Sequence, residues 1–84
     1  MENYYIVREE IIINNTFNEG VLLRTTDKKR AERIANKTFL AMSKTPEFIG
    51  AIVNDTVNKK ILHNTISGDS YIVEIEEYNS KDIE

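Results

Sequence analysis

The chain has 84 residues, a formal net charge of −3, one histidine and no cysteine. The absence of cysteine excludes disulfides, thiol catalysis and cysteine-ligated metal sites, and a lone histidine excludes multi-histidine metal sites. With 40% hydrophobic and 30% charged residues, the composition indicates one folded domain over residues 1–84, whose thin core favours self-association into a homo-oligomer.

Two strands are expected at the start of the chain. Residues 4–13 are rich in Tyr, Ile and Val, which favour strands, and residues 21–26 form a second short strand antiparallel to the first. Residues 14–20 between them have the composition of a turn. Because alternate side chains of a strand share a face, one face of the first strand carries Tyr5, Val7, Glu9, Ile11 and Ile13. Neither face of that strand is cleanly polar, so we expect both to be partly covered.

Residues 27–43 predict an amphipathic helix, because apolar side chains recur at spacings of three and four. The apolar stripe consists of Ala31, Ile34, Ala35, Thr38, Phe39 and Met42. Thr26 or Asp27 can cap the first turn, since both side chains accept backbone N–H bonds. Thr45 precedes Pro46 and is therefore disfavoured in a helix, so the helix ends before this position.

A second helix is the favoured interpretation of the next segment. Thr45, Pro46 and Glu47 form a helix start signal, and apolar residues follow at helical spacing up to Ile61. Gly50 and several β-branched residues weaken the helix propensity. A strand over residues 48–53 is the alternative.

The last predicted element is a strand over residues 71–78, preceded by a turn at residues 67–70 and followed by a polar tail at residues 79–84 that we expect to be frayed. We expect this strand to pair with the first. The fold class is therefore α+β, a small two-layer domain with an antiparallel sheet of three or more strands on one or two helices. The element order is β-β-α-α-β, with β-β-α-β-β as the alternative.

The histidine and the carboxylates give little support for an enzyme. His63 lies near the end of the predicted second helix, where an imidazole suits a helix C-terminus better than it suits isolated general-base catalysis. Glu74, Glu76 and Glu77 form an acidic surface on the last strand, and Glu74 and Glu76 share a face. This surface is interpreted as a solvated sheet face, with a partner-binding surface or a metal or acid–base site as alternatives. We expect no catalytic residue, no cofactor and no metal.

Positive charge is concentrated in one segment. Residues 24–44 carry seven basic and two acidic side chains, a net +5, whereas the rest of the chain carries four basic and twelve acidic, a net −8. Cations near a helix N-terminus are repelled by the positive end of the helix dipole. A bound anion would neutralise them and would also accept hydrogen bonds from the free N–H groups of the first turn. An ordinary charged helix face, with Glu32 pairing locally, is the alternative. The predicted site for a phosphate or an acidic partner surface comprises Arg24, Thr25, Thr26, Lys28, Lys29, Arg30 and Arg33.

Phe17 is a further candidate for partner contact. It is an isolated aromatic residue in the predicted polar turn of residues 14–20. Exposed aromatic residues anchor interfaces more often than other side chains do. The alternative is a phenylalanine that folds back onto the core.

Residues 21–62 resemble the ribbon–helix–helix DNA-binding family. Residues 21–26 look like its strand, residues 27–43 like its first helix, and residues 45–49 like the start of its second helix. In that family two strands pair in a dimer and enter the major groove. The resemblance implies that Arg24 and Thr26 contact bases and that Thr45 contacts phosphate.

Binding, and not catalysis, is the predicted function. The chain is rich in Ile, Asn and Lys, whose codons are AT-rich, and its small size suits an accessory or inhibitor protein of a phage or mobile element. Such a protein would sequester a host protein or a phosphorylated small molecule, with DNA-binding regulation as the alternative. The N-terminal residues lack the basic and apolar regions of a signal peptide, so a cytoplasmic location without membrane contact is expected.

Overall fold

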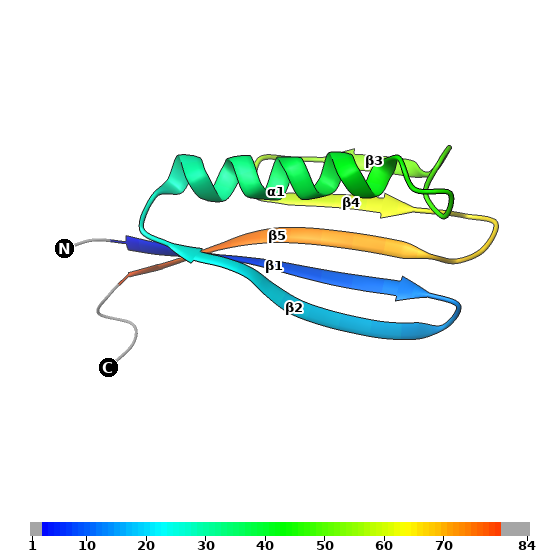
Figure 1. The fold of residues 1–84 in the computed structure, drawn as a ribbon, viewed down its shortest axis with the longest axis horizontal. Helices are drawn as coiled ribbons and strands as arrows, with labels where there is room; N and C mark the ends of the chain where they lie inside the picture. The colour runs from blue at the N-terminus through cyan, green and yellow to red at the C-terminus, as the bar shows by residue number, and fades with distance from the viewer. Residues whose placement is uncertain (1–2, 80–84) are drawn as a thin grey trace.

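A computed structural model describes residues 3–79 as one antiparallel sheet with a single helix on one of its faces (Figure 1). The strand order is β2-β1-β5-β4-β3, so the first and last strands pair at the centre, as predicted. This arrangement confirms the small α+β fold class. In chain order the elements are β1 (Asn3–Ile13), β2 (Thr16–Thr25), α1 (Lys28–Ser43), β3 (Ile52–Asp55), β4 (Lys59–His63) and β5 (Ser70–Asn79).

The first hairpin has a tighter turn than the composition indicates. Asn14 and Asn15 have φ angles of 53° and 63°, in the left-handed region that asparagine tolerates and that two-residue hairpin turns require. The predicted turn over residues 14–20 therefore shrinks to these two residues, and β2 begins at Thr16. Phe17 lies in this strand opposite Ile12, and not in a loop as predicted.

The predicted second helix is wrong. The Thr45–Glu47 start signal produces one turn, in which the backbone N–H groups of Phe48 and Ile49 donate to the Thr45 carbonyl at 3.0 and 3.1 Å. Gly50 then has a φ of 78°, which takes the chain out of the helical region. The following β-branched residues form β3, which returns as β4. The alternative strand over residues 48–53 overlaps β3 by two residues only. The alternative element order, β-β-α-β-β, has two strands after the helix, whereas the structure has three.

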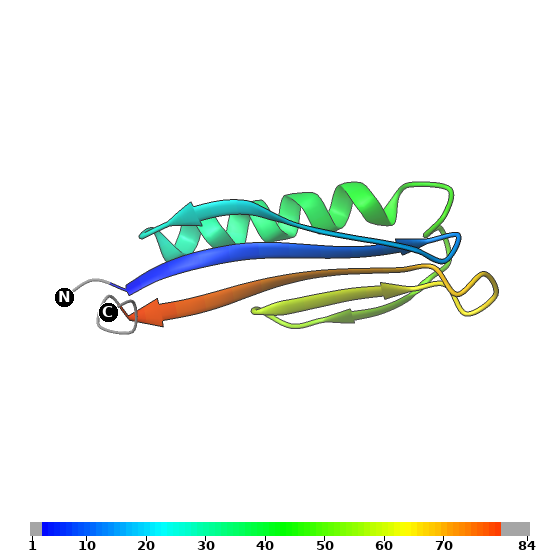
Figure 2. The same cartoon turned by 90° about the horizontal axis from the view of Figure 1, so that it is seen from below.

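The core lies between α1 and the middle of the sheet. The predicted stripe faces inward, with Ala31, Ala35 and Phe39 buried and Met42 packed against them. The helix packs mainly on β5, β1 and β2 (Figure 2). Phe48 from the turn after the helix closes one end, with its ring centroid 6.5 Å from that of Tyr71. The sheet residues buried in this core are Tyr5, Val7, Leu62, Tyr71, Val73 and Ile75.

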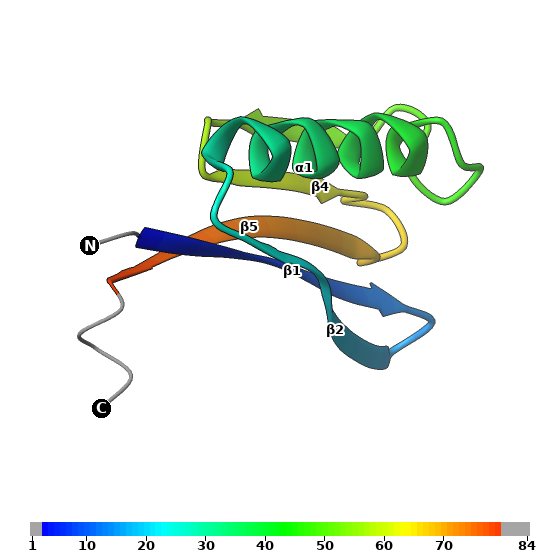
Figure 3. The ribbon, with the colours of Figure 1, turned by 60° about the vertical axis from the view of Figure 1, so that its left-hand side comes forward.

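The sheet face opposite α1, here called the open face, is covered by no other element of residues 3–79 (Figure 3). On it the rings of Tyr4 and Tyr78 stack with centroids 5.3 Å apart. Strand alternation and register place on this face Ile6, Arg8, Glu10 and Ile12 of β1, and Ile72, Glu74 and Glu76 of β5. Of the predicted frayed tail, Asn79 is the last residue of β5, and residues 80–84 lie outside the described part.

Replacing Phe39 by alanine tests the helix–sheet contact. Phe39 is buried between α1 and the sheet, so Phe39→Ala should lower the free energy of unfolding by about 3–5 kcal/mol. Leu40 is the matched control, because it is the next residue and is 47% exposed. Urea denaturation should give a loss below about 1 kcal/mol for Leu40→Ala. Equal losses for both variants would contradict this placement of the helix.

Candidate functional site

The outer side of α1 carries a cluster of exposed cations, here called the basic face, that comprises Lys29, Arg30, Arg33 and Lys37. Lys29, Arg33 and Lys37 follow one another at spacings of four, so they form a stripe along the helix. The stripe lies opposite the buried side of the helix. The position of the basic face is thus fixed by the same periodicity that buries Ala31, Ala35 and Phe39.

The cations of the basic face have no ion pair within residues 3–79. The three ion pairs there join Arg8 to Glu76, Lys59 to Glu74 and Lys60 to Asp55, all on the sheet. The local pairing expected of Glu32 is absent from this part of the chain. The positive charges of the helix therefore point to solvent without a neutralising partner, and their fields add over the face.

The N-terminus of α1 is occupied by a carboxylate of the chain itself. Of the two predicted caps, Thr26 and Asp27, it is Asp27 that caps the helix, and its Oδ1 accepts the backbone N–H of Arg30 at 3.1 Å. The Thr25 hydroxyl oxygen accepts the Asp27 N–H at 3.0 Å. The phosphate site predicted at this helix start thus has one of its two threonines, Thr25, and part of its N–H groups already engaged. Thr26 is exposed beside the cap.

The structure does not bring the whole predicted set together. Arg24 pairs in register with Ile6, which places it on the open face, away from the helix. Thr25 pairs with Tyr5 on the helix side of the sheet and is half-buried. Lys29, Arg30 and Arg33 are therefore the part of the predicted site that forms one surface, whereas Lys28 lies beside Tyr5 and Ile75 on the sheet side of the helix.

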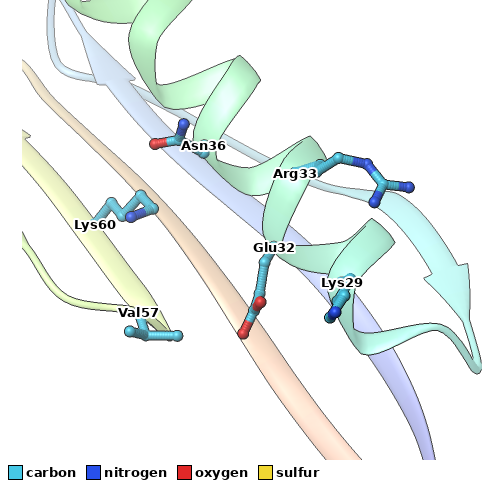
Figure 4. Close-up of a pocket in the computed structure, with 6 residues that line it drawn as sticks. All are labelled: Lys29, Glu32, Arg33, Asn36, Val57 and Lys60. Atoms are coloured by element: carbon cyan, nitrogen blue, oxygen red, sulfur yellow. The ribbon is translucent and has the colours of Figure 1, made fainter.

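A shallow groove of about 530 Å³ lies between α1 and the β3–β4 hairpin. Figure 4 shows the Glu32 carboxylate and the Lys60 chain directed into this space, whereas the Arg33 guanidinium extends away from the hairpin. The lining residues are Lys29, Glu32, Arg33, Asn36, Val57 and Lys60. The last three are not predicted by the sequence, because a helix over residues 48–61 would have placed Val57 and Lys60 elsewhere.

Lys60 is used inside the protein. Its Nζ donates to Asp55 Oδ1 at 2.5 Å and to the Thr56 carbonyl at 3.2 Å, and it lies 5.8 Å from the centroid of the Phe39 ring. Cation–π and ion-pair contacts together offset the cost of burying this charge. Lys60 thus holds the hairpin against α1 and is not a free cation for a ligand.

The other predicted candidates lie on the sheet. Phe17 is exposed on the open face. His63 is exposed at the end of β4 opposite Ser70, so its predicted position near a helix C-terminus is wrong. Of the acidic surface, Glu74 and Glu76 share the open face, whereas Glu77 lies on the other face and accepts from Asn3 Nδ2 at 2.6 Å. Residues 3–79 contain no group of three or more His, Asp or Glu side chains placed to hold a metal ion.

One polar contact lies within the core. The hydroxyl of buried Tyr71 donates to Glu9 Oε1 at 2.8 Å. Burial raises the pKa of Tyr71 well above its usual value, and the hydrogen bond to Glu9 and the negative charge of that carboxylate raise it further. Glu9 therefore serves as an acceptor on the helix side of the sheet.

Comparison with family models, with curated proteins and with solved structures finds no match to this chain. No helix within residues 3–79 combines the length and the apolar character that crossing a membrane requires. The functional interpretation therefore depends on the geometry of the basic face and the groove.

The raised pKa of Tyr71 predicts a loss of stability in alkali. The neutral phenol contributes its full stability below the unfolded-state pKa of about 10, and this contribution is lost as the pH rises above that value toward the folded-state pKa. Tyr71→Phe should therefore flatten the fall in unfolding free energy above about pH 10. Ultraviolet difference spectra should show one tyrosine that ionises only on unfolding. Ionisation of all four tyrosines in the folded state would contradict the burial of this hydroxyl.

Removing Asp55 tests the anchoring role of Lys60. Asp55→Asn leaves a buried ammonium without its counter-charge and should cost about 1–3 kcal/mol of unfolding free energy. The same change in a Lys60→Met background should cost much less, because no buried charge remains. The control is Glu74→Gln, which removes the partner of the more exposed Lys59 at 3.9 Å and should cost less than about 1 kcal/mol.

Proposed function

We propose that this protein is a non-enzymatic binding protein whose basic face docks onto an acidic surface of a protein partner. The observation that carries the proposal is the contrast between two sets of cations. Three of the four sheet cations are ion-paired (Arg8, Lys59 and Lys60, but not Arg24), whereas Lys29, Arg30, Arg33 and Lys37 on α1 are exposed and unpaired within the described residues. An acidic surface would supply the missing counter-charge and accelerate association.

A protein surface suits this face better than a small phosphorylated molecule does. Asp27 already occupies the helix N-terminus, so a phosphate would meet scattered side chains and not a cradle of N–H groups. Leu40 is 47% exposed, two turns beyond Arg33 on the same side of the helix. From Lys29 to Leu40 the stripe extends about 16 Å. Interfaces between proteins combine such an apolar contact with a charged rim.

DNA-binding regulation of the ribbon–helix–helix kind is the alternative. The second helix that the resemblance implies is replaced by turns, β3 and β4. The strand that would pair across a dimer is part of β2, which pairs along one side with β1. Arg24 also lies on a different face from the basic face. The remaining support for this alternative is the positive charge of α1, which would attract the phosphates of a DNA duplex.

The cellular role that suits such a module is occupation of a host protein. The chain is small and rich in Ile, Asn and Lys, whose codons are AT-rich, and the exposed side of its helix is positively charged. These features fit an accessory inhibitor of a phage or mobile element. Such an inhibitor acts by covering a surface with which its target binds another molecule. We place this encounter in the cytoplasm.

Paired glutamine variants test the basic face. Lys29→Gln with Arg33→Gln removes two charges of the helix, and Arg8→Gln with Lys59→Gln removes two charges of the open face as the matched control. Quantitative capture from bacterial lysate with mass spectrometry should identify a protein that binds the wild type and the control alike. Its affinity for the helix variant should fall about tenfold.

The measurement also separates the alternatives. Equal loss of binding in both double variants would contradict docking through α1. A salt-dependent mobility shift of duplex DNA that only the helix variant loses, without a captured protein, would favour the DNA-binding alternative.

A further inference from the structure

The β3 edge of the sheet exposes an unusual concentration of aliphatic side chains. β3 is the last strand in the sheet order. Ile49, Ile52, Val53 and Val57 are each more than half exposed. Asp55 is the one charged residue between positions 49 and 57. This segment, here called the β3 edge, therefore presents an apolar border to solvent.

The hairpin register shows which backbone groups of β3 point outward. The Thr56 N–H donates to the Lys59 carbonyl at 3.0 Å, so these two residues form a hydrogen-bonded pair. Hydrogen-bonded and non-bonded pairs alternate along an antiparallel ladder. Asn54 and Ile52 consequently bond to β4. The N–H and C=O groups of Val53 and Asp55 face away from β4, where residues 3–79 supply no strand.

The opposite edge of the sheet is interrupted by a bulge, whereas the β3 edge is regular and has Asp55 as its one charged residue. The β1–β2 register contains a bulge at Val7 and Arg8, and β2 carries the charges of Glu19 and Arg24. Bulges and charges are the features by which proteins prevent unwanted strand pairing. The β3–β4 register is unbroken, and β3 itself contains no lysine, arginine or proline. Strand addition is therefore expected at β3.

We propose that two copies of this chain pair β3 against β3, antiparallel, about a two-fold axis at Val53. This axis sets Val53 opposite Val53, and each exchanges its outward N–H and C=O groups with the other. It brings Ile49 of one copy to the end of the strand where Val57 of the second copy lies. Asp55 falls opposite Ala51, so the two carboxylates do not face each other. The β3 edge is thus apolar on both sides of the pairing, and the register sets no like charges opposite each other.

The pairing produces one continuous sheet with closed two-fold symmetry. It does not involve the basic face, whose cations lie on α1 and not on the sheet edge. The dimer would present two basic faces to partners, and its existence is independent of the function proposed above.

Charge-swap variants at Val53 test both the dimer and its register. Sedimentation velocity should show a reversible dimer for the wild type. Val53→Lys and Val53→Glu should each raise its dissociation constant more than about tenfold, because like charges meet across the axis. An equimolar mixture of the two variants should dimerise again. Val21→Lys is the matched control, since Val21 is 42% exposed on the other edge, against 54% for Val53, and it should dimerise like the wild type.

Amide hydrogen exchange gives a second measurement that needs no variant. Protection of Val53 and Asp55 should rise with protein concentration, while Ile52 and Asn54 stay protected throughout by β4. A wild type that stays monomeric at millimolar concentration would overturn the proposal. So would a dimer that Val21→Lys disrupts and Val53→Lys does not, or a mixture of the charged variants that stays monomeric.

Discussion

The antiparallel pairing of β1 with β5 is the contact on which the rest of the structure depends. It runs from Asn3 opposite Asn79 to Ile12 opposite Ser70, and it joins the two ends of the described chain at the centre of the sheet. Closing so long a loop costs chain entropy, which the burial of Val7, Val73 and Ile75 along this pair offsets. The two hairpins extend outward from this pair, and α1 packs on it.

Close packing of α1 follows from its small inward residues. Ala31 and Ala35 are buried, so the helix backbone can approach the centre of the sheet, while Phe39 fills the space toward β4. A helix held by one narrow stripe leaves most of its circumference to solvent. That surface carries the unpaired cations, whereas every ion pair among the described residues lies on the sheet. The charge asymmetry of the sequence thus becomes an asymmetry between two layers.

A single helix also leaves parts of a five-stranded sheet without cover. The open face uses stacked tyrosines and ion pairs at positions that water can reach, which lowers the cost of exposing it. The β3–β4 hairpin lies beyond the main contact of the helix and is held by Lys60 and by Leu62, which is buried in the core. The groove and the β3 edge both result from this incomplete coverage. The most exposed apolar border of the sheet is therefore the one farthest from β2.

The sequence determined the elements whose signals are local. Strand alternation in residues 4–13 and 71–78, the apolar stripe of residues 27–43 and the Asp27 cap each depend on neighbours within one or two turns, and each is found in the structure. The basic face follows from the same stripe. Where local signals conflict, tertiary contacts determine the secondary structure of the segment. Phe48 enters the core and Gly50 takes a left-handed φ, so residues that fit a helical spacing became a turn and a hairpin.

The position of each charge relative to the others required the fold as well. Arg24 lies four positions before Lys28, the first residue of α1, yet β-sheet alternation turns it to the opposite face. Lys60 finds Asp55 and Phe39 only because β4 folds back under α1. Sequence periodicity therefore determined which residues share a face of one element. Only the packing of elements against each other decided which faces meet, which charges are neutralised and which edge of the sheet stays free.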